Sequence, residues 1–336
     1  YDIRLSLVGS EMCIRDRSMG DKVYLTYEQQ IEKLKRDGLI FDDEREAIAR
    51  LKWEGYYNFA VGYNRLFKDE KKRYIRGTRF RHIEALYNFD KHLRGIVYEY
   101  TQGVECNIKA LIADTFSKRY GVNERSYLSE ENFTSREEER GNVRWLISTC
   151  KEILKDSLDE DSKSYRDYIA HNAERYGHVP LWALIRALSF GNTSKFLKLM
   201  KAEDRAEIAS EYGLAGNILC NMTEMLVGYR NIAAHGERVF CAHLPAVRLS
   251  DNLPVWKSLQ VPRFSDGRRK YGKCDFLALV VIFKYMLPKE EFSVFLRRTA
   301  AETEELKRVL PPFAMRRVYE ETGLSGAWRK LDAMKK

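Results

Sequence analysis

The sequence predicts an all-α protein, and three observations support this fold class. Apolar residues recur at helical spacing along most of the chain, while the alternation typical of strands is scarce. Thr, Asp and Gly stand where helices would begin and end. The 336 residues suffice for one large or two ordinary domains, and an apolar content of 44% can build a substantial core.

The N-terminal helices have recognisable start signals. Thr26 with Gln29 fits a capping box, and Gly38 is a plausible stop for the helix that follows it. Asp42 or Asp43 can cap the next helix. A long helical pattern over 80–113 then has a broad apolar face. We expect further helices over residues 143–158, 181–188, 194–200, 205–212 and 218–229, and a short β-hairpin is possible around 239–250.

A break in the helical pattern follows near residue 250. Pro254, Pro262 and the Gly-, Arg- and Lys-rich segment 266–273 interrupt it. Beyond the break we expect helices over 276–286 and 289–310, and a short one near Trp328. The sequence therefore predicts a main helical domain over 19–250 and a basic helical section over 251–336.

Residues 1–18 are expected to be a non-native extension. Residues 6–17 resemble the translation of sequencing-adapter DNA, and they lack the layout of a signal peptide. Met19 is the expected native start.

Charge and cysteine usage narrow the choice of partners. The formal charge of +9, with 20 Tyr and 16 Phe available for stacking, makes nucleic acid the first candidate, although an ordinary basic protein would show the same excess. The six cysteines are scattered without a CxxC pair, which disfavours a zinc site and fits a reduced, cytoplasmic protein. No apolar run is long enough to span a bilayer. We therefore expect no metal, no cofactor and no membrane association.

The most informative segment is 229–238, which places Arg230, Asn231 and His235 near the end of an apolar helical run. Arg offers a fixed fork of donors to phosphate, and His exchanges protons near neutral pH. On an ideal helix Asn231, His235 and Arg238 share one face, whereas Arg230 points about 140° away from His235. Arg230 would have to join through its long side chain, a local break in the helix, or a site on a partner.

Spacing alone leaves a second interpretation open. The same Arg-to-His spacing occurs from Arg166 to His171 and from Arg238 to His243. The segment 229–238 is equally compatible with a helix end whose His is satisfied by the backbone and whose Arg pairs with an acid such as Glu237.

The segment 230–238, Arg-Asn-Ile-Ala-Ala-His-Gly-Glu-Arg, resembles the signature of the abortive-infection Abi-like family of the AbiD/AbiF type, a branch of the HEPN superfamily. Further blocks resemble this family in the same order. They are 24–30 with 38–39, the pairs around 55–57 and 62–63, 80–94, 179–182 and 188–191. One departure is Phe240-Cys241, where many relatives read Trp-Asn, and this difference bears on whether the site is active.

The resemblance implies a helical HEPN domain with an N-terminal helical region over 19–250. It further implies a metal-independent endoribonuclease of anti-phage defence, similar to the toxins of toxin–antitoxin pairs. Such an enzyme would act as a homodimer and would bind a structured non-coding RNA. The residues fit this chemistry, because attack of a 2′-OH on the adjacent phosphate needs a base, an acid and positive charge. We expect His235 as base or acid, Arg230 on the phosphate and Asn231 orienting either group, with Glu237 and Arg238 in support. One motif per chain supplies one His, so two chains would complete the site.

Two basic clusters are candidate RNA contacts, with aromatic residues interleaved. The first cluster comprises Lys71, Lys72, Arg73, Arg76, Arg79 and Arg81, with Tyr74 and Phe80; the second comprises Arg263, Arg268, Arg269, Lys270 and Lys273, with Phe264 and Tyr271. Arg166 and His171 form a weaker alternative catalytic pair. The competing functions are an inactive RNA-binding scaffold with a HEPN fold, which Cys241 favours, and a helical protein-interaction module, which explains the basic clusters poorly.

Overall fold

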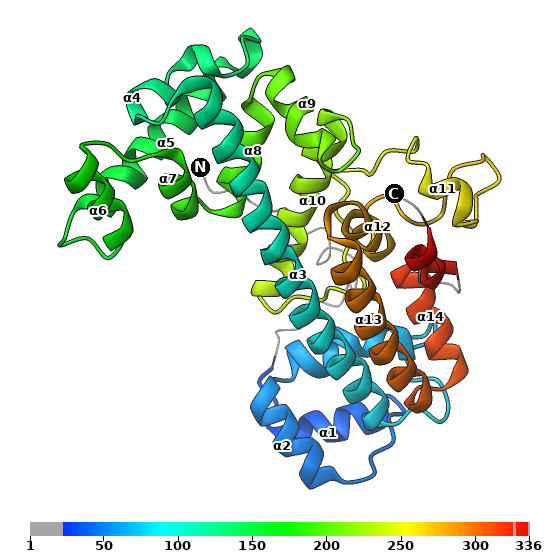
Figure 1. The fold of residues 1–336 in the computed structure, drawn as a ribbon. Coiled ribbons are helices and arrows are strands. Elements are labelled where there is room, and N and C mark those ends of the chain that lie inside the picture. Colours follow the sequence, from blue (N-terminus) through cyan, green and yellow to red (C-terminus); the bar gives the residue numbers. More distant parts are fainter. Residues whose placement is uncertain (1–22, 325–326, 335–336) are drawn as a thin grey trace. The chain divides into compact units, whose positions relative to one another are not determined.

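The structure, a computed structural model, describes residues 23–324 and 327–334 (Figure 1). Helices joined by turns and loops account for these residues, and the only β pairing among them consists of isolated bridges. The all-α prediction is confirmed. Residues 1–18 and Met19, which we expected to be an extension and the native start, lie outside the described residues.

The chain forms two compact units, which divide between Arg81 and His82. The first unit contains α1 (Tyr27–Arg36), α2 (Glu44–Glu54), a π-helical turn (Tyr57–Val61) and a 3₁₀ turn (Asn64–Phe67). The predicted capping box is present, because Thr26 and Gln29 exchange side-chain and backbone hydrogen bonds. Asp43, one of the two predicted caps, accepts hydrogen bonds from the first amides of α2.

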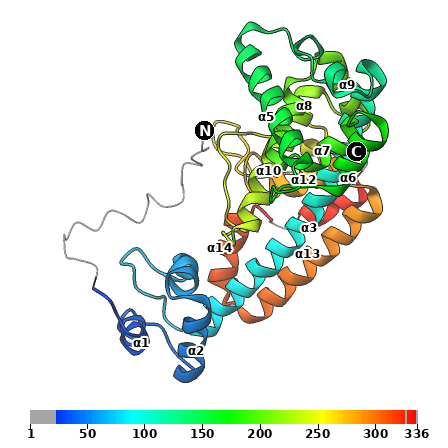
Figure 2. The ribbon, with the colours of Figure 1, turned by 90° about the vertical axis from the view of Figure 1, so that its left-hand side faces the viewer.

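The longest helix of the second unit is α3 (Phe80–Tyr120), which extends seven residues beyond the predicted end of its pattern at residue 113. It lies alongside α13 (Lys289–Val309) in both views (Figures 1 and 2). The rings of Tyr100 and Phe295 meet edge-on at 5.3 Å between centroids. Arg298 also donates to Glu99 at 2.8 Å. Aromatic packing and an exposed ion pair therefore join helices from opposite ends of the sequence.

Around one part of α3 stand the helices of the middle of the chain. They are α4 (Glu124–Tyr127), α5 (Arg140–Leu158), α6 (Asp167–Tyr176), α7 (Leu181–Ala187), α8 (Phe190–Leu199), α9 (Ala202–Ser210) and α10 (Gly216–Ala234), with short 3₁₀ turns at Glu130–Asn132 and Glu137–Glu139. Phe116, Phe133 and Phe196 form a buried aromatic cluster with centroids 4.9 to 5.4 Å apart. Helix α10 contacts α8, α9 and α12. This helix, which ends in the candidate motif, is therefore held from several sides.

The C-terminal helices surround α12 (Phe276–Met286), whose residues are all buried. They are α11 (Val255–Ser258), α13, α14 (Pro312–Thr322) and a 3₁₀ segment (Ala327–Ala333). Helix α12 begins and ends at the predicted residues, with Asp275 as its N-cap. The expected boundary near residue 250 falls inside the second unit. Helices α4, α6, α11 and α14 are additions to the sequence-based expectation.

The possible β-hairpin over 239–250 does not form. The backbone amides of Val239 and Phe240 donate to the carboxylate of Asp90, on α3. The amides of Leu244 and Leu249 donate to the carbonyl oxygens of Cys274 and Lys273. Because these amides bind distant segments, the two halves of the expected hairpin do not pair with each other.

Two helix-ending glycines offer a test of how closely the last helix packs. Gly323 and Gly177 end α14 and α6 in the same left-handed conformation, each with φ of 71°. A Cβ on Gly323 would lie 2.9 Å from the Cβ of Tyr271, whereas a Cβ on Gly177 would meet nothing within 4 Å. We expect Gly177→Ala to cost about 1 kcal/mol through backbone strain alone. Gly323→Ala should cost about 2 to 4 kcal/mol, because crowding adds to that strain. Urea unfolding of both variants measures the difference, and equal losses would contradict this packing.

Candidate functional site

The candidate motif lies where α10 ends. Gly236 adopts a left-handed φ of 72°, and its amide donates to the carbonyl of Ala233. The amide of Glu237 donates to the carbonyl of Ile232 at 3.0 Å. These two bonds form a Schellman motif, in which glycine takes up the conformation that other residues avoid. The turn fixes His235 as the C-cap of the helix, directly after its last residue.

Asn231 and His235 lie one helical turn apart. The amide of His235 donates to the carbonyl of Asn231 at 2.9 Å, so the two side chains leave the same face of α10. His235 is exposed, while Arg230 and Asn231 are half-buried. This end of the helix presents an imidazole to solvent with an amide beside it.

Arg230 joins this face through its long side chain, one of the three ways we considered. Its Nη1 donates to Oδ1 of Asn231 at 3.3 Å. Its Nε is buried and has no hydrogen-bond partner among the described residues. A guanidinium with an unused buried donor is suited to an anionic ligand, because an unsatisfied polar atom costs free energy.

Arg238 is not on the helix face that we expected. Helix α10 ends at Ala234, and the left-handed Gly236 turns the chain before Arg238 is reached. The shared face of Asn231, His235 and Arg238 therefore reduces to the first two residues. Glu237 is exposed and follows the same turn. Our placement of Arg238 on this face assumed an ideal helix through residue 238. That assumption ignored the stop at Gly236.

The segment after the motif is held by Asp90, which the sequence did not single out as a functional residue. Asp90 is fully buried, and its Oδ1 accepts the amides of Val239 at 3.0 Å and Phe240 at 2.9 Å. Its Oδ2 accepts from Nη1 of Arg94 at 2.8 Å. We call Asp90 and Arg94 the clamp. Its sequence signals are an Asp four residues before an Arg, a spacing that is common on exposed helices, and the position of both residues in the family-like block 80–94.

A second contact holds the same segment from α10. The hydroxyl of Tyr229 donates to the carbonyl of Ala242 at 3.2 Å. Burial raises the pKa of Tyr229 well above its usual value, so the hydroxyl stays protonated and remains a donor. Phe240 is buried and Cys241 is half-buried in this segment. The chain after His235 is thus bound both to α3 and to the helix that it leaves.

Residues 49–241 match the sequence model of the Abi-like protein family, and this match covers more than half of the chain. The chain belongs to the Abi-like protein family. Neither the curated proteins nor the solved structures contain a match. Membership of this family suggests a role in abortive infection, a defence against phage. The matched region includes the clamp and the motif up to Cys241.

The alternative pair lies elsewhere in this Abi-like protein. Arg166 precedes α6, and its Nη1 donates to the carbonyl of Ser164 at 2.6 Å and to Oγ of Ser157 at 3.3 Å. His171 is exposed on α6, with its ring against that of Tyr176. Helix α6 contacts α5 and α7, whereas the motif ends α10. The guanidinium of Arg166 thus joins α6 to the end of α5.

The first basic cluster belongs to the first unit. Lys71, Lys72, Arg73, Arg76 and Arg81 are exposed there, and Arg79 is half-buried. The guanidinium of Arg79 forms an ion pair with Asp42. Tyr74 and Phe80 are buried, so these interleaved rings cannot stack on bases as we expected. The cluster therefore offers charge without exposed aromatic rings of its own.

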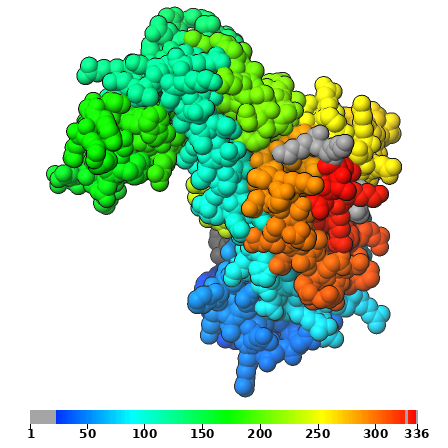
Figure 3. Space-filling view, in the orientation of Figure 1, coloured from blue at the N-terminus to red at the C-terminus, as the bar shows by residue number. Residues whose placement is uncertain are grey.

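The second basic cluster is built on a loop formed by residues 262–270, which we call the basic loop. The amide of Phe264 donates to the carbonyl of Arg268, and that of Lys270 to the carbonyl of Pro262, both at 2.8 Å. Arg263, Arg268 and Lys270 are exposed, and the ring of Phe264 is half exposed. The part of the chain that contains α11 and the basic loop lies at the surface of the second unit (Figure 3, yellow). Lys273 is half-buried beyond the loop.

Arg269 corrects the predicted set of RNA contacts. Its side chain is only 4% exposed, and its guanidinium lies 3.8 Å from the ring centroid of Trp256. It also forms an ion pair with Asp251 at 2.9 Å. Arg269 therefore attaches the basic loop to α11, and it is not available to a ligand. Tyr271 is also unsuitable for stacking, because it is half-buried and its Cβ lies close to Gly323.

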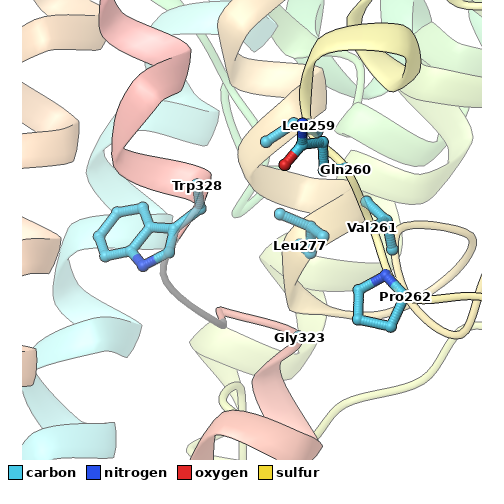
Figure 4. Close-up of a pocket in the computed structure, with 7 residues that line it drawn as sticks. All are labelled: Leu259, Gln260, Val261, Pro262, Leu277, Gly323 and Trp328. Carbon is cyan, nitrogen blue, oxygen red and sulfur yellow. The ribbon is translucent and has the colours of Figure 1, made fainter.

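A pocket lies beside the basic loop. Its lining includes Leu259, Pro262, Leu277 and Trp328 (Figure 4). Across residues 23–324 and 327–334, no group of three or more His, Cys, Asp or Glu side chains is placed to hold a metal ion. Within the same ranges no helix is both long and apolar enough to cross a membrane.

Neighbouring arginines of the basic loop should respond differently to substitution. We expect Arg269→Ala to destabilise the protein by about 2 kcal/mol, since it removes a buried guanidinium from Trp256 and leaves Asp251 without its partner. Arg268→Ala is the matched control, because Arg268 is exposed and pairs only locally with Asp266. It should change stability by less than about 0.5 kcal/mol. Thermal unfolding compares the two, and a neutral Arg269→Ala would refute the anchoring role.

Proposed function

We propose that this protein is an endoribonuclease of an abortive-infection system, with a HEPN-type site formed by Arg230, Asn231 and His235. The observation that carries this proposal is the hydrogen bond from Arg230 to Asn231 on the helix face that bears the exposed His235. This face combines a phosphate-binding cation with a proton-transfer group. The unpartnered Nε of Arg230 supports the same role.

The reaction that these groups fit is transesterification of RNA. The 2′-OH attacks the adjacent phosphorus, the bond from phosphorus to O5′ breaks, and the products are a 2′,3′-cyclic phosphate and a 5′-OH end. A base takes the proton of the 2′-OH and an acid supplies one to O5′. Arg230 would stabilise the negative charge on the phosphate. These steps use side chains alone, so the proposed enzyme needs no metal ion.

One chain supplies only one of the two proton-transfer groups. The motif contains one histidine, His235, beside an amide and a guanidinium. We therefore propose a homodimer in which His235 of each subunit contributes, one as base and the other as acid. Exposure of His235 at a helix end is compatible with such a shared site.

We further propose that the protein binds a structured non-coding RNA as well as its target RNA. The basic loop supports this, because Arg263, Arg268 and Lys270 are exposed beside the half-exposed ring of Phe264. Cations neutralise phosphates, and an exposed ring can stack on an unpaired base. The exposed cations of the first basic cluster, in the other unit, offer phosphate contacts of their own.

The alternative function is an inactive RNA-binding scaffold. Cys241 favours it, because the family resemblance leads us to expect Asn there and a thiol is a weaker hydrogen-bonding group than an amide. This scaffold would keep the fold and the basic loop but would not cleave RNA.

The nuclease is tested with the purified protein on labelled RNA in the presence of EDTA. We expect cyclic-phosphate and 5′-OH products, and a loss of about 10²- to 10⁴-fold in His235→Ala, because a proton-transfer group is removed. His171→Ala, which removes the exposed histidine of the alternative pair in the family region, should retain full cleavage; a loss in this variant instead would assign the reaction to the alternative pair. Equal cleavage by wild type and His235→Ala would refute the assignment. RNA binding without any cleavage would favour the scaffold.

The basic loop is tested through the salt dependence of binding to a fluorescent single-stranded RNA of mixed sequence. Joint substitution of Arg263, Arg268 and Lys270 by Ala should lower the slope of log affinity against log salt by about 2, because each phosphate contact on a single strand contributes about 0.7. The control replaces three exposed lysines elsewhere, Lys118, Lys151 and Lys163, so that net charge changes equally. The same fall in slope for both triples would show that net charge alone attracts RNA.

A further inference from the structure

The clamp binds a segment that lies close along the chain to His235, the residue that would carry the chemistry. Three residues separate His235 from Val239, whose amide donates to Asp90. Between these two residues, the amides of Gly236 and Glu237 form the Schellman bonds back to Ala233 and Ile232, which fix the end of α10. The chain is therefore bound to residues of α10 that precede His235 and to α3 at Val239, only four positions after His235.

Burial of the charged clamp costs desolvation free energy, which an apolar residue at the same place would avoid. A buried carboxylate pays a large desolvation penalty unless partners satisfy it. Asp90 meets this requirement with a guanidinium on Oδ2 and two amides on Oδ1. The second of these amides belongs to Phe240, which is buried in turn. The carboxylate of Asp90 therefore links the guanidinium of Arg94 to the segment after the motif.

We propose that Asp90 and Arg94 are positioning residues for His235, which they hold in the orientation needed for proton transfer. This inference rests on the proposed function, and it adds a requirement on α3 that the motif alone does not contain. Small displacements of a reacting group reduce rates strongly, so loosening of the loop should lower kcat while leaving substrate binding nearly intact.

The central variant is Asp90→Asn. It preserves the size of the side chain and an oxygen for the two amides, but it turns an NH₂ group toward the donors of Arg94. We expect kcat to fall about 10- to 100-fold with KM within about threefold of wild type. Asp90→Asn combined with Arg94→Gln places an acceptor opposite that NH₂ group again. This double variant should recover most of the loss, whereas additive losses would argue against a clamp.

Asp204→Asn is the matched control for stability. Asp204 is also fully buried, and it binds Arg119 at 2.7 Å and the hydroxyl of Tyr120 at 2.8 Å, joining the end of α3 to α9. It has no bond to the segment after the motif. We expect its substitution to lower the unfolding midpoint and to leave kcat unchanged. Equal losses of kcat in Asp90→Asn and Asp204→Asn would overturn the proposal, because stability alone would then explain both.

A measurement that does not need activity separates this inference from the proposed function. The chain has six histidines, so the ring signal of His235 can be assigned in NMR spectra by its loss in His235→Ala. In Asp90→Asn this signal should shift, and the amides of Val239 and Phe240 should lose hydrogen-exchange protection. The double variant should reverse both changes, and Asp204→Asn should cause neither. An unshifted His235 signal in a folded Asp90→Asn protein would overturn the clamp.

The outcomes remain distinct if individual proteins fail. A wild type without His235-dependent cleavage defeats the proposed function, and the His235 signal then decides the clamp by itself. Should Asp90→Asn not fold, Arg94→Gln alone decides. A partial loss of kcat with a shifted His235 signal would support the clamp, and no change in either would overturn it.

Discussion

One buried carboxylate determines where the chain goes after the candidate motif. Asp90 accepts two consecutive amides of the segment that leaves α10, and Arg94 balances its charge. That segment has no regular structure of its own to satisfy those amides, and buried amides without partners are costly. A side chain of the long helix α3 therefore supplies the hydrogen-bond acceptors that a neighbouring strand would supply in a sheet. The position of the motif relative to α3 depends on this exchange of hydrogen bonds.

Features set by neighbouring residues were predictable from the sequence. The capping box at Thr26, the cap at Asp43 and both ends of α12 follow from short patterns of capping and apolar residues. The absence of a hairpin over 239–250 did not follow. The partner of the amide of Val239 lies 149 residues earlier, and periodicity carries no information about such distant pairing.

The candidate site shows the same division. The motif pointed to Arg230, Asn231 and His235 because residue types and family resemblance identify groups that can do chemistry. Residue types did not distinguish charged side chains that are exposed to solvent from charged side chains that are buried in contacts within the protein. Arg268 and Arg269 are adjacent and identical in type, yet one is exposed and the other is stacked on Trp256. Only packing distinguishes them, because a guanidinium serves equally well as an anchor or as a ligand contact.

The distance between the two halves of the clamp matters for the growing polypeptide. Asp90 leaves the ribosome long before Val239 and Phe240 are added, since 149 and 150 residues separate them. Chains usually begin to fold while synthesis continues, and contacts between remote segments form late. A nascent chain cannot fix the segment beside His235 until most of the protein has been made. A chain that ends before Val239 would consequently lack both bonds that tie the segment beside His235 to Asp90.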